Sequence, residues 1–185
     1  MWQAEVILLA TAATMISIQY YKSPCGELLL GAYDNQLCLC DWRYRKQRAQ
    51  VDRRLQNYLK ADYIEQGAGV IEQAIGQLEQ YFCQQRTRFD IPLLFAGTDF
   101  QQAVWQALVA IPYGELASYG ELARRLERPD AVRAVASANG ANALSIFVPC
   151  HRIVGSNGAL TGYAGGLAAK QKLLTLEQSG QGVLF

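Results

Sequence analysis

The chain has 185 residues and 51% of them are hydrophobic, so it is long enough to bury the core of one good-sized domain or of two small ones. Acidic and basic residues are mixed along its length and leave a net charge of +1, which excludes a polyacidic tail, a basic tail and a strongly cationic coat for nucleic acid. Its five cysteines lack the spacing of a disulfide framework, which predicts free thiols in a reducing cytoplasm.

The first 15 residues are apolar without having the pattern of a secretory signal. This segment contains Glu5 and has no Lys or Arg before Lys22, so the basic region of a signal peptide is missing. We expect a frayed extension or an addition to the edge of a sheet. The chain nowhere contains about 18 uncharged apolar residues in a row, which excludes a transmembrane helix and predicts no membrane partner.

The first third of the chain predicts an antiparallel sheet. Three apolar runs, ISIQYY (16–21), ELLLGAY (27–33) and QLCLCDW (36–42), are separated by the turn KSPCG and by a two-residue turn of hairpin type, Asp34–Asn35. From residue 43 to residue 82, helical spacing takes over from alternation. Its clearest apolar stripe predicts a helix that packs on the sheet and consists of Val70, Ile71, Ala74, Ile75, Leu78, Tyr81 and Phe82.

An aperiodic segment from Cys83 to Gly97 divides the chain. It contains Pro92 and Gly97 and shows no hydrophobic period, which is typical of a linker. We therefore expect an α/β domain with its linker over residues 1–94 and a second domain over residues 95–185.

Capping boxes mark two helix starts in the second half. Thr98 with Gln101, and Ser118 with Glu121, have the spacing at which each side chain bonds the backbone N–H of the other, and IPYG separates the two helices. A third short helix is expected to run to Gly140, its candidate C-cap.

The end of the chain predicts a strand, a turn and a helix. Leu144, Ile146 and Val148 alternate as in a strand, GSNG (155–158) is a turn signal, and the last helix starts at Leu167. Three helices followed by a hairpin predict a winged helix-turn-helix, so the expected fold class is α+β.

The segment VPCHRIVG (148–155) contains the single histidine of the chain, directly after a cysteine. Pro149 fixes its own φ and stiffens the support of the Cys150 thiol. The thiolate is the reactive form, and His151 is the one side chain here that titrates naturally near neutral pH, so it can take the thiol proton. Contact between the two requires a turn after Pro149 or a bridging water, because adjacent strand residues point to opposite faces. Glu177 on the last helix is the candidate that orients the imidazole.

This pair has a structural alternative, because a buried cysteine often acts as a small hydrophobe and a lone histidine is often a satisfied core residue. The preceding helix gives the next indication. Helices that read sequence present long polar side chains to base edges, whereas this one presents mainly alanine and serine, with Arg133 as its one long basic side chain. Such a helix can lie against DNA without reading it, and Arg133 can act as a wedge in the base stack. The alternative is that the alanines are packed core.

A thiol that follows such a helix suggests chemistry on a base flipped out of the duplex. The sequence resembles the O6-alkylguanine-DNA alkyltransferases, also called methylated-DNA–protein-cysteine methyltransferases. VPCHRIV matches the signature of this family, and the segments PYGELASYGELA, AVRAVASANGAN and TGYAGGLAAKQKLLTLE stand where its members carry similar ones. The resemblance covers about Phe100 to Glu177, and the first half is similar only in size and arrangement.

The resemblance implies a ribonuclease-H-like first domain and a winged helix-turn-helix domain that carries the PCHR motif. It also implies that Cys150 irreversibly accepts the alkyl group of O6-alkylguanine, that His151 takes the thiol proton through a water, and that Glu177 holds His151. In the same way it implies that Asn142 orders the site and that Tyr119 assists nucleotide rotation. The implied DNA-binding residues are Arg133, Tyr119, Ala134, Ser137 and Ala138, and the implied base-pocket residues are Val148, Tyr163, Gly162 and Ala164.

No cofactor and no metal are expected. Some family members bind zinc through cysteines and histidines of the first domain, but the single histidine here lies in the motif. Cys38 and Cys40 share a strand face and could join Cys25 and Cys83, yet the CxxC spacing is missing, so we expect buried structural cysteines. The protein is expected to be a cytoplasmic monomer that binds double-stranded DNA independently of sequence through its second domain, with O4-alkylthymine as a further candidate substrate.

Three alternatives predict different behaviour. A winged-helix regulator with an inert or redox-sensing Cys150 would prefer one operator sequence. A cysteine hydrolase would turn over repeatedly on an ester or peptide, but the adjacent Cys-His spacing does not favour it. A lesion-binding relative of the alkyltransferases would lack the cysteine that is present here.

Overall fold

The computed structural model describes residues 15–179, so the extension expected at the N-terminus lies, up to residue 14, outside the described residues. The strands β1 (Met15–Ser23), β2 (Gly26–Tyr33) and β3 (Gln36–Trp42) form the predicted antiparallel meander. Asp34 and Asn35 join β2 to β3 with φ values of 48° and 57°, the left-handed conformation that a two-residue hairpin turn requires. This part of the sequence prediction is confirmed.

The region from residue 43 to residue 82 contains more than the expected helical stretch. It forms α2 (Arg48–Leu59), a short strand β4 (Asp62–Glu65) and α3 (Gly69–Phe82). Lys60, with φ 51°, ends α2 and turns the chain into β4. The three predicted strands are antiparallel, as expected, but β4 was not predicted, and because it pairs in parallel with β1 the sheet is mixed, with the order β3-β2-β1-β4.

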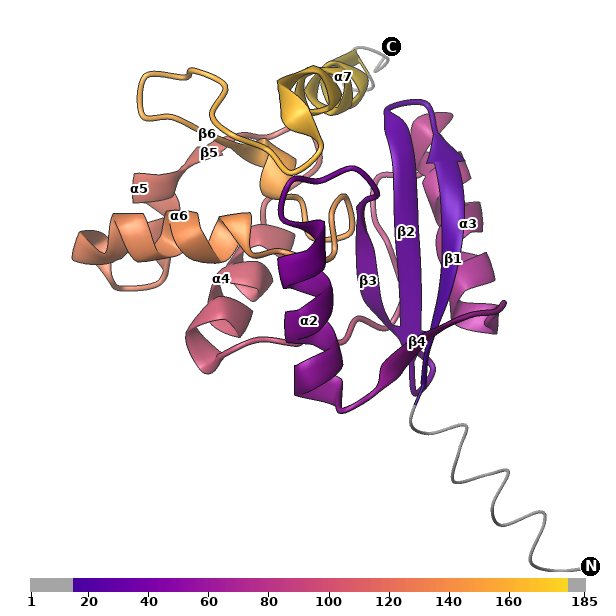
Figure 1. Ribbon diagram of the computed structural model, residues 1–185. Helices are drawn as coiled ribbons and strands as arrows, with labels where there is room; N and C mark the ends of the chain where they lie inside the picture. Colours follow the sequence, from indigo (N-terminus) through magenta and orange to yellow (C-terminus); the bar gives the residue numbers. More distant parts are fainter. Residues whose placement is uncertain (1–14, 180–185) are drawn as a thin grey trace, which may run out of the picture.

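Helices cover both faces of this sheet (Figure 1). Leu28 and Leu30 pack in one cluster with the predicted stripe of α3, while Leu29 packs in a second cluster with Val51 and Leu55 of α2. The alternation of side chains along β2 sends neighbours to opposite faces, so a strand that is apolar at successive positions is buried between two layers.

The predicted linker is irregular, as expected, but it is attached to the sheet. The backbone N–H of Leu37 donates to Pro92 O (2.8 Å), and Leu94 N–H donates to Leu37 O (2.9 Å). The segment therefore lies along the start of β3 before the chain enters its helical part.

The C-terminal part contains the predicted helices and two short strands. Both capping boxes are present, at Thr98 and Ser118, where the expected helices begin. Two single-turn 3₁₀ helices, η1 (Pro129–Ala131) and η2 (Cys150–Arg152), interrupt the other elements. Those elements are α4 (Asp99–Val109), β5 (Ala117–Ser118), α5 (Tyr119–Arg125), α6 (Val132–Gly140), β6 (Ile153–Val154) and α7 (Gly166–Ser179).

Three local predictions for this part were wrong. The segment 144–148 is a tight irregular turn with Ile146 at φ 75°, not a strand. The wing hairpin is replaced by a parallel pair, β5 with β6. Gly140 is the last residue of α6, but its cap is Ala141 in a right-handed conformation. The first two errors share a cause: residues 143–148 are buried on all sides, so their apolar alternation does not indicate a two-faced strand.

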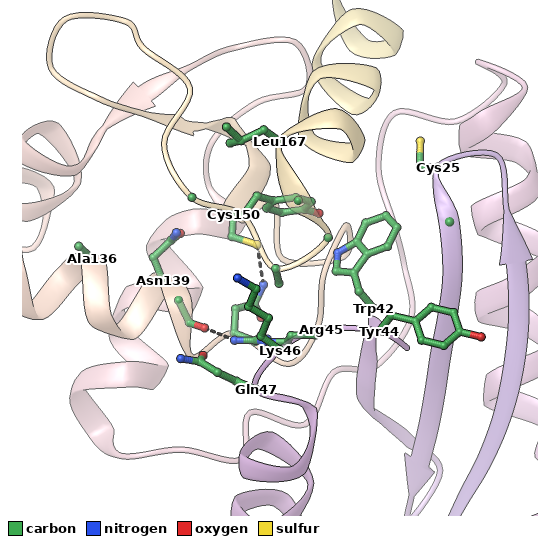
Figure 2. Close-up of a pocket in the computed structure, with 18 of the residues that line it drawn as sticks. Cys25, Trp42, Tyr44, Arg45, Lys46, Gln47, Ala136, Asn139, Cys150 and Leu167 are labelled. Carbon is green, nitrogen blue, oxygen red and sulfur yellow. Dashed lines mark hydrogen bonds between the residues drawn. The ribbon is translucent and has the colours of Figure 1, made fainter.

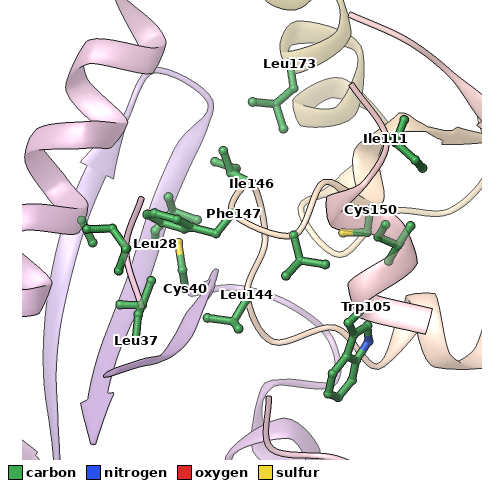
Figure 3. Packing of buried hydrophobic residues seen from close by; sticks show 14 of the residues in the cluster. Leu28, Leu37, Cys40, Trp105, Ile111, Leu144, Ile146, Phe147, Cys150 and Leu173 are labelled. Carbon is green, nitrogen blue, oxygen red and sulfur yellow. The ribbon is translucent and has the colours of Figure 1, made fainter. Parts of the chain in front are cut away.

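One continuous apolar cluster joins the two parts of the chain. Figure 3 shows Leu28, Leu37 and Cys40 of the sheet next to Leu144 and Phe147 of the turn before the motif. Within residues 15–179, no helix has the length and apolar character needed to cross a membrane. The motif is thus held against the sheet on a packed support.

Candidate active site

The Cys150 thiol lies on a turn, which the sequence analysis gave as one condition for a Cys-His pair. After Pro149, residues Cys150–Arg152 form a 3₁₀ turn instead of continuing a strand. The backbone N–H of Cys150 donates to Val148 O (2.7 Å), and Val148 N–H donates to Leu144 O (2.8 Å). The backbone on both sides of the thiol is therefore fixed by local hydrogen bonds.

Asn142 holds the thiol. Its Nδ2 donates to Cys150 Sγ (3.2 Å) and to Val148 O (3.1 Å), while its Oδ1 accepts from Leu144 N–H (2.9 Å). Because Oδ1 faces a backbone donor, the amide has one consistent orientation, with its N–H groups toward the sulfur. The geometry thus places Asn142 where the sequence analysis expected an ordering residue.

The thiol is only 4% exposed, and this burial raises the pKa of Cys150 to about 11. The Asn142 hydrogen bond lowers the pKa of the same thiol, as do the positive charges of Arg45 and Lys170, while the charge of Asp41 raises it. The resting sulfur is therefore a protonated thiol near neutral pH, and its proton must be removed when it reacts.

His151 is fully buried, and its hydrogen bond to Glu177 decides which ring nitrogen carries the proton. Nε2 lies 2.7 Å from Glu177 Oε1. An ionised carboxylate only accepts, so Nε2 carries the hydrogen and Nδ1 keeps its lone pair. Nδ1 has no hydrogen-bond partner within the described residues. Burial lowers the pKa of His151, so the ring is neutral and Nδ1 is free to accept a proton.

Glu177 is the centre of a buried polar network. Its Oε1 accepts from Tyr81 Oη (2.7 Å) and Arg152 Nη2 (3.0 Å), and its Oε2 accepts from Arg152 Nε (2.8 Å) and Gly114 N–H (3.0 Å). Burial alone would raise the pKa of this carboxyl, but the hydrogen bonds from His151 and Arg152 and the charge of Arg152 outweigh burial and hold the pKa well below its usual range. Glu177 is therefore an anion with a full set of donors, which suits it to fix the imidazole.

The sulfur faces a cleft of about 820 Å³ between the two parts of the chain (Figure 2). Besides Cys150 and Asn142, four of the predicted residues line it, namely Tyr119, Gly162, Tyr163 and Ala164. Its walls also hold buried polar atoms without a partner within residues 15–179, namely Asn139 Oδ1, Trp42 Nε1 and Tyr163 Oη. Such atoms are available to bond a polar ligand such as a purine.

Val148 does not line this cleft, so its assignment to the base pocket was wrong. The residue is fully buried, and its carbonyl already accepts hydrogen bonds from Asn142 and from the Cys150 backbone.

Three of the four α6 residues predicted to contact DNA lie on the exposed face of this helix. Arg133, Ala134 and Ser137 are exposed, whereas Ala138 is 3% exposed and its carbonyl accepts from Trp105 Nε1 (2.9 Å). Ala138 therefore belongs to the core, and its assignment to the DNA surface was wrong. Tyr119 stands at the first turn of α5, with its hydroxyl 3.2 Å from Thr161 Oγ1 at the mouth of the cleft.

Comparison with known proteins identifies the family. The family model for the "6-O-methylguanine DNA methyltransferase, ribonuclease-like domain" matches residues 16–95. The model for the DNA binding domain of the same family matches residues 99–179. The chain belongs to the 6-O-methylguanine DNA methyltransferase family. It is similar to methylated-DNA–protein-cysteine methyltransferases of Mycobacterium tuberculosis (42% identity, 89% of this chain and 94% of the relative) and Methanosarcina mazei (48%, 85% and 94%). A crystal structure of M. tuberculosis OGT in complex with DNA superposes with a TM-score of 0.76, at 40% identity over 89% of this chain and 94% of that one.

In this family member the remaining cysteines do not form a metal site within the described residues. No group of three His, Cys, Asp or Glu side chains within residues 15–179 could hold a metal ion. Cys38 is the extra residue of a β-bulge opposite Gly31 and Ala32, so Cys38 and Cys40 lie in different core clusters and not on a shared face. Cys83 is exposed and Cys25 is half-buried, so the expectation that all four are buried was wrong.

The N-terminal part of this family member contributes residues to the site that its sequence did not indicate. Tyr81 was predicted only as part of the apolar stripe of α3, yet its hydroxyl reaches Glu177. Trp42 at the end of β3 and Arg45 in the following loop line the cleft, although this strand gave no functional signal. Arg152, which pairs with Glu177, stands in the motif beside His151, so its position was the one signal in the sequence that could have identified it.

Proposed function

We propose that this protein repairs DNA by direct reversal of damage, accepting the alkyl group of O6-alkylguanine on Cys150. The observation that carries the proposal is the position of Sγ: it lines an open cleft, held by Asn142, next in the chain to an imidazole whose Nδ1 is free. The cleft has polar atoms for a purine and lies beside a helix with small exposed side chains. O4-alkylthymine offers a similar leaving group and is the second substrate to test.

The transfer is an in-line displacement at saturated carbon. The thiol proton moves through a bridging water to Nδ1 of His151, and the sulfur attacks the alkyl carbon. The new S–C bond forms as the C–O6 bond breaks. The electron pair of the C–O6 bond stays on guanine, which then takes up a proton. The Tyr119 hydroxyl donates to the guanine as its negative charge develops, and Glu177 stabilises the imidazolium that forms.

Each molecule acts once, because the thioether product is a poor leaving group. The target base must leave the stack to reach Sγ, since Cys150 is buried at the wall of the cleft. Arg133 fills the gap that the base leaves, while Ala134 and Ser137 allow α6 to approach a groove closely. Because α6 has no other long basic side chain, we infer that binding is independent of sequence.

The wider assignments follow from the same interpretation. We propose that residues 1–94 and 95–185 are two domains, that the second carries the DNA contacts, and that the protein works as a cytoplasmic monomer without a cofactor. Small net charge limits the number of phosphate contacts and predicts weak, mildly salt-dependent affinity.

Intact-protein mass spectrometry after incubation with duplex DNA containing O6-methylguanine tests the reaction. We expect one methyl group per protein, mapped to Cys150 and absent in Cys150→Ser. Cys83→Ser, which removes an exposed thiol, is the matched control and should be methylated like the wild type. Methylation that persists in Cys150→Ser would overturn the assignment. Repeated turnover would favour a hydrolase, and specific lesion binding without transfer would favour a lesion sensor.

A further inference from the structure

Arg45 is a buried cation on the loop between β3 and α2, at the N-terminal rim of the cleft. It is 8% exposed, and its Nη1 donates to Asp41 Oδ2 (2.9 Å). The same Nη1 donates to Asn142 O (2.9 Å), and Nη2 donates to Gly140 O. Figure 2 shows Arg45 and Cys150 among the residues that line the same cleft. One guanidinium thus links the sheet to the segment that ends α6 and precedes the motif.

This segment needs such a partner. The last carbonyls of a helix accept no hydrogen bond from within the helix. They carry partial negative charge, which nearby cations stabilise. Arg45 takes the carbonyls of Gly140 and Asn142, and Arg54 of α2 takes the carbonyl between them, that of Ala141 (2.6 Å). Two arginines from the N-terminal part therefore cap the C-terminal end of the helix that carries Arg133.

Asp41 keeps Arg45 in place. This carboxylate is fully buried and also accepts from Arg48 Nη1 (3.0 Å), from Trp42 N–H (2.9 Å) and from Ser145 Oγ (3.3 Å). Ser145 belongs to the turn before the motif. The Asp41–Arg45 pair is thus bonded on one side to the loop that carries the nucleophile and on the other to the end of α6.

We propose that Arg45 is a positioning residue for alkyl transfer, which clamps the Asn142 backbone to the N-terminal part so that the Asn142 side chain presents its amide to Cys150 Sγ. This inference rests on the proposed function of Cys150. The mechanism requires an Asn142 amide that stays in reach of the sulfur while the thiolate forms, and the carbonyl of the same residue is the atom that Arg45 holds. The contacts of Arg45 thus connect α6, the segment that precedes Cys150 and the first half of the chain.

The charge of Arg45 acts in the same direction as its geometry. The charged groups that influence the sulfur are Asp41 from β3, Arg45 from the following loop and Lys170 from α7, with the Tyr163 hydroxyl and His151 nearby. Arg45 and Lys170 lower the pKa of Cys150, and Asp41 raises it. Loss of the guanidinium therefore removes both a hydrogen-bond donor for Asn142 and a positive charge that favours the thiolate.

The test is the single-turnover rate of transfer from free O6-benzylguanine, measured against pH for the wild type, Arg45→Met and Arg45→Lys. The free base removes DNA binding from the measurement. For Arg45→Met we expect full final labelling of Cys150 but a rate–pH profile displaced upward by about one unit, which is about a tenfold lower rate on its rising limb. Arg45→Lys keeps the charge but not the forked geometry, so its rate should lie between the two.

Two matched variants separate positioning from other effects. Arg53→Met removes an exposed cation from the same helix as Arg54 and should leave the profile unchanged. Arg54→Met removes the other capping cation without touching Asn142 and should keep the wild-type profile. If it slows transfer as much as Arg45→Met, helix capping and not Asn142 is the cause, and the proposal is overturned.

Final labelling distinguishes the outcomes, because misfolded molecules lower the labelled fraction whereas a misplaced amide lowers the rate. A wild-type profile in Arg45→Met, or a loss confined to the labelled fraction, would overturn the inference. If Arg45→Met yields no folded protein, Arg45→Lys decides, and a wild-type rate in that variant overturns the proposal. Absence of labelling in the wild-type protein would refute the proposed function itself.

Discussion

Replacing Glu177 by glutamine keeps the shape of the side chain and removes its charge. All five hydrogen bonds to the carboxylate come from donors, two of them from Arg152. At the Oε2 position an amide –NH2 would face the Gly114 N–H and Arg152 Nε–H, neither of which can accept. At the Oε1 position the –NH2 would meet Arg152 Nη2, which cannot accept either, but also His151 and Tyr81, which can change their roles to accept, so the amide turns its –NH2 to this position.

This orientation of the amide has a chemical consequence. If Nε2 of His151 accepts from the amide, the ring proton moves to Nδ1, and the free lone pair that takes the thiol proton is lost. A positioned general base contributes about 10²–10⁴ in rate, and the wrong tautomer costs about 10⁴ in the Ser-His-Asp enzymes. We expect the rate of transfer to Cys150 to fall at least about 100-fold in Glu177→Gln.

The same change destabilises the fold, because Arg152 stays buried without its counterion. Removing one partner of a buried ion pair costs about 3–5 kcal/mol. For a chain of this length, each kcal/mol lowers Tm by about 2–4 °C, so a decrease of about 10 °C is expected. Thermal unfolding by circular dichroism measures this decrease, and single-turnover benzyl transfer well below the transition measures the rate.

Glu115→Gln, which neutralises an exposed carboxylate, is the matched control and should change neither quantity. Transfer at the wild-type rate in Glu177→Gln would refute the reasoning that Glu177 fixes the imidazole tautomer, whatever happens to Tm. A lower rate with an unchanged Tm would instead contradict the energetic account of the Arg152 pair.

Three further predictions concern the DNA wedge, acid stability and the cleft wall. Arg133→Ala should slow transfer from duplex DNA much more than transfer from free O6-benzylguanine, and equal losses would contradict the wedge role. The pKa of Glu177 is depressed in the folded protein, so its contribution to stability is present above its unfolded pKa of about 4.3 and is lost as the pH falls toward the folded value. Thermal unfolding between pH 7 and pH 3 should therefore show the wild type losing more stability than Glu177→Gln, and parallel curves would count against this. In Gly165→Ala the new Cβ would stand 2.4 Å from Trp42 Cε2, so the ring must move and the free energy of unfolding should fall by about 1–3 kcal/mol in urea titrations. Gly76→Ala, where a Cβ meets open space within α3, is its control, and an equal loss there would exclude the Trp42 contact as the cause.

The parts of the fold that could be predicted are those whose signals are local. Thr98 and Ser118 start their helices through bonds to residues three positions ahead, and the Asp34–Asn35 turn specifies its own φ values. β4 and the β5–β6 pair depend on distant partners. β4 is a short, mostly exposed strand that pairs with β1, so no apolar pattern marks it. Such elements are decided by tertiary contacts, which a single sequence does not report.

The error at Ala138 shows what the sequence of α6 does contain. Val135 is the one branched apolar side chain in the middle of this helix, and it faces the core. Residues three positions apart share a helix face, so Ala138 points inward with Val135, while Ala134 and Ser137 share the outer face. Reading the alanines by helical period, and not only by resemblance, would have separated the core residue from the DNA surface.

The site could be predicted where its residues lie in or near the motif, and not where the first half of the chain contributes. Cys150, His151 and Glu177 are recognisable by their chemistry, and Asn142 by its position. Asp41 bonds Ser145, and Tyr81 bonds Glu177, across about 100 residues of chain, and both lie in strongly apolar elements. Their polar atoms have meaning only when the two halves of the chain are packed, because a buried polar group requires a partner from elsewhere.

The high pKa of Cys150 fits a protein that is consumed by its own reaction. With a pKa of about 11, about one thiol in 10⁴ is ionised at pH 7, so the resting sulfur reacts slowly with stray electrophiles. Intrinsic nucleophilicity rises with thiol pKa, so the thiolate that forms when His151 takes the proton is a strong one, as attack on saturated carbon requires. A permanently ionised thiol would react with other electrophiles. A buried thiol that loses its proton to the neutral His151 imidazole only during the reaction stays available for an alkylated nucleobase in the cleft.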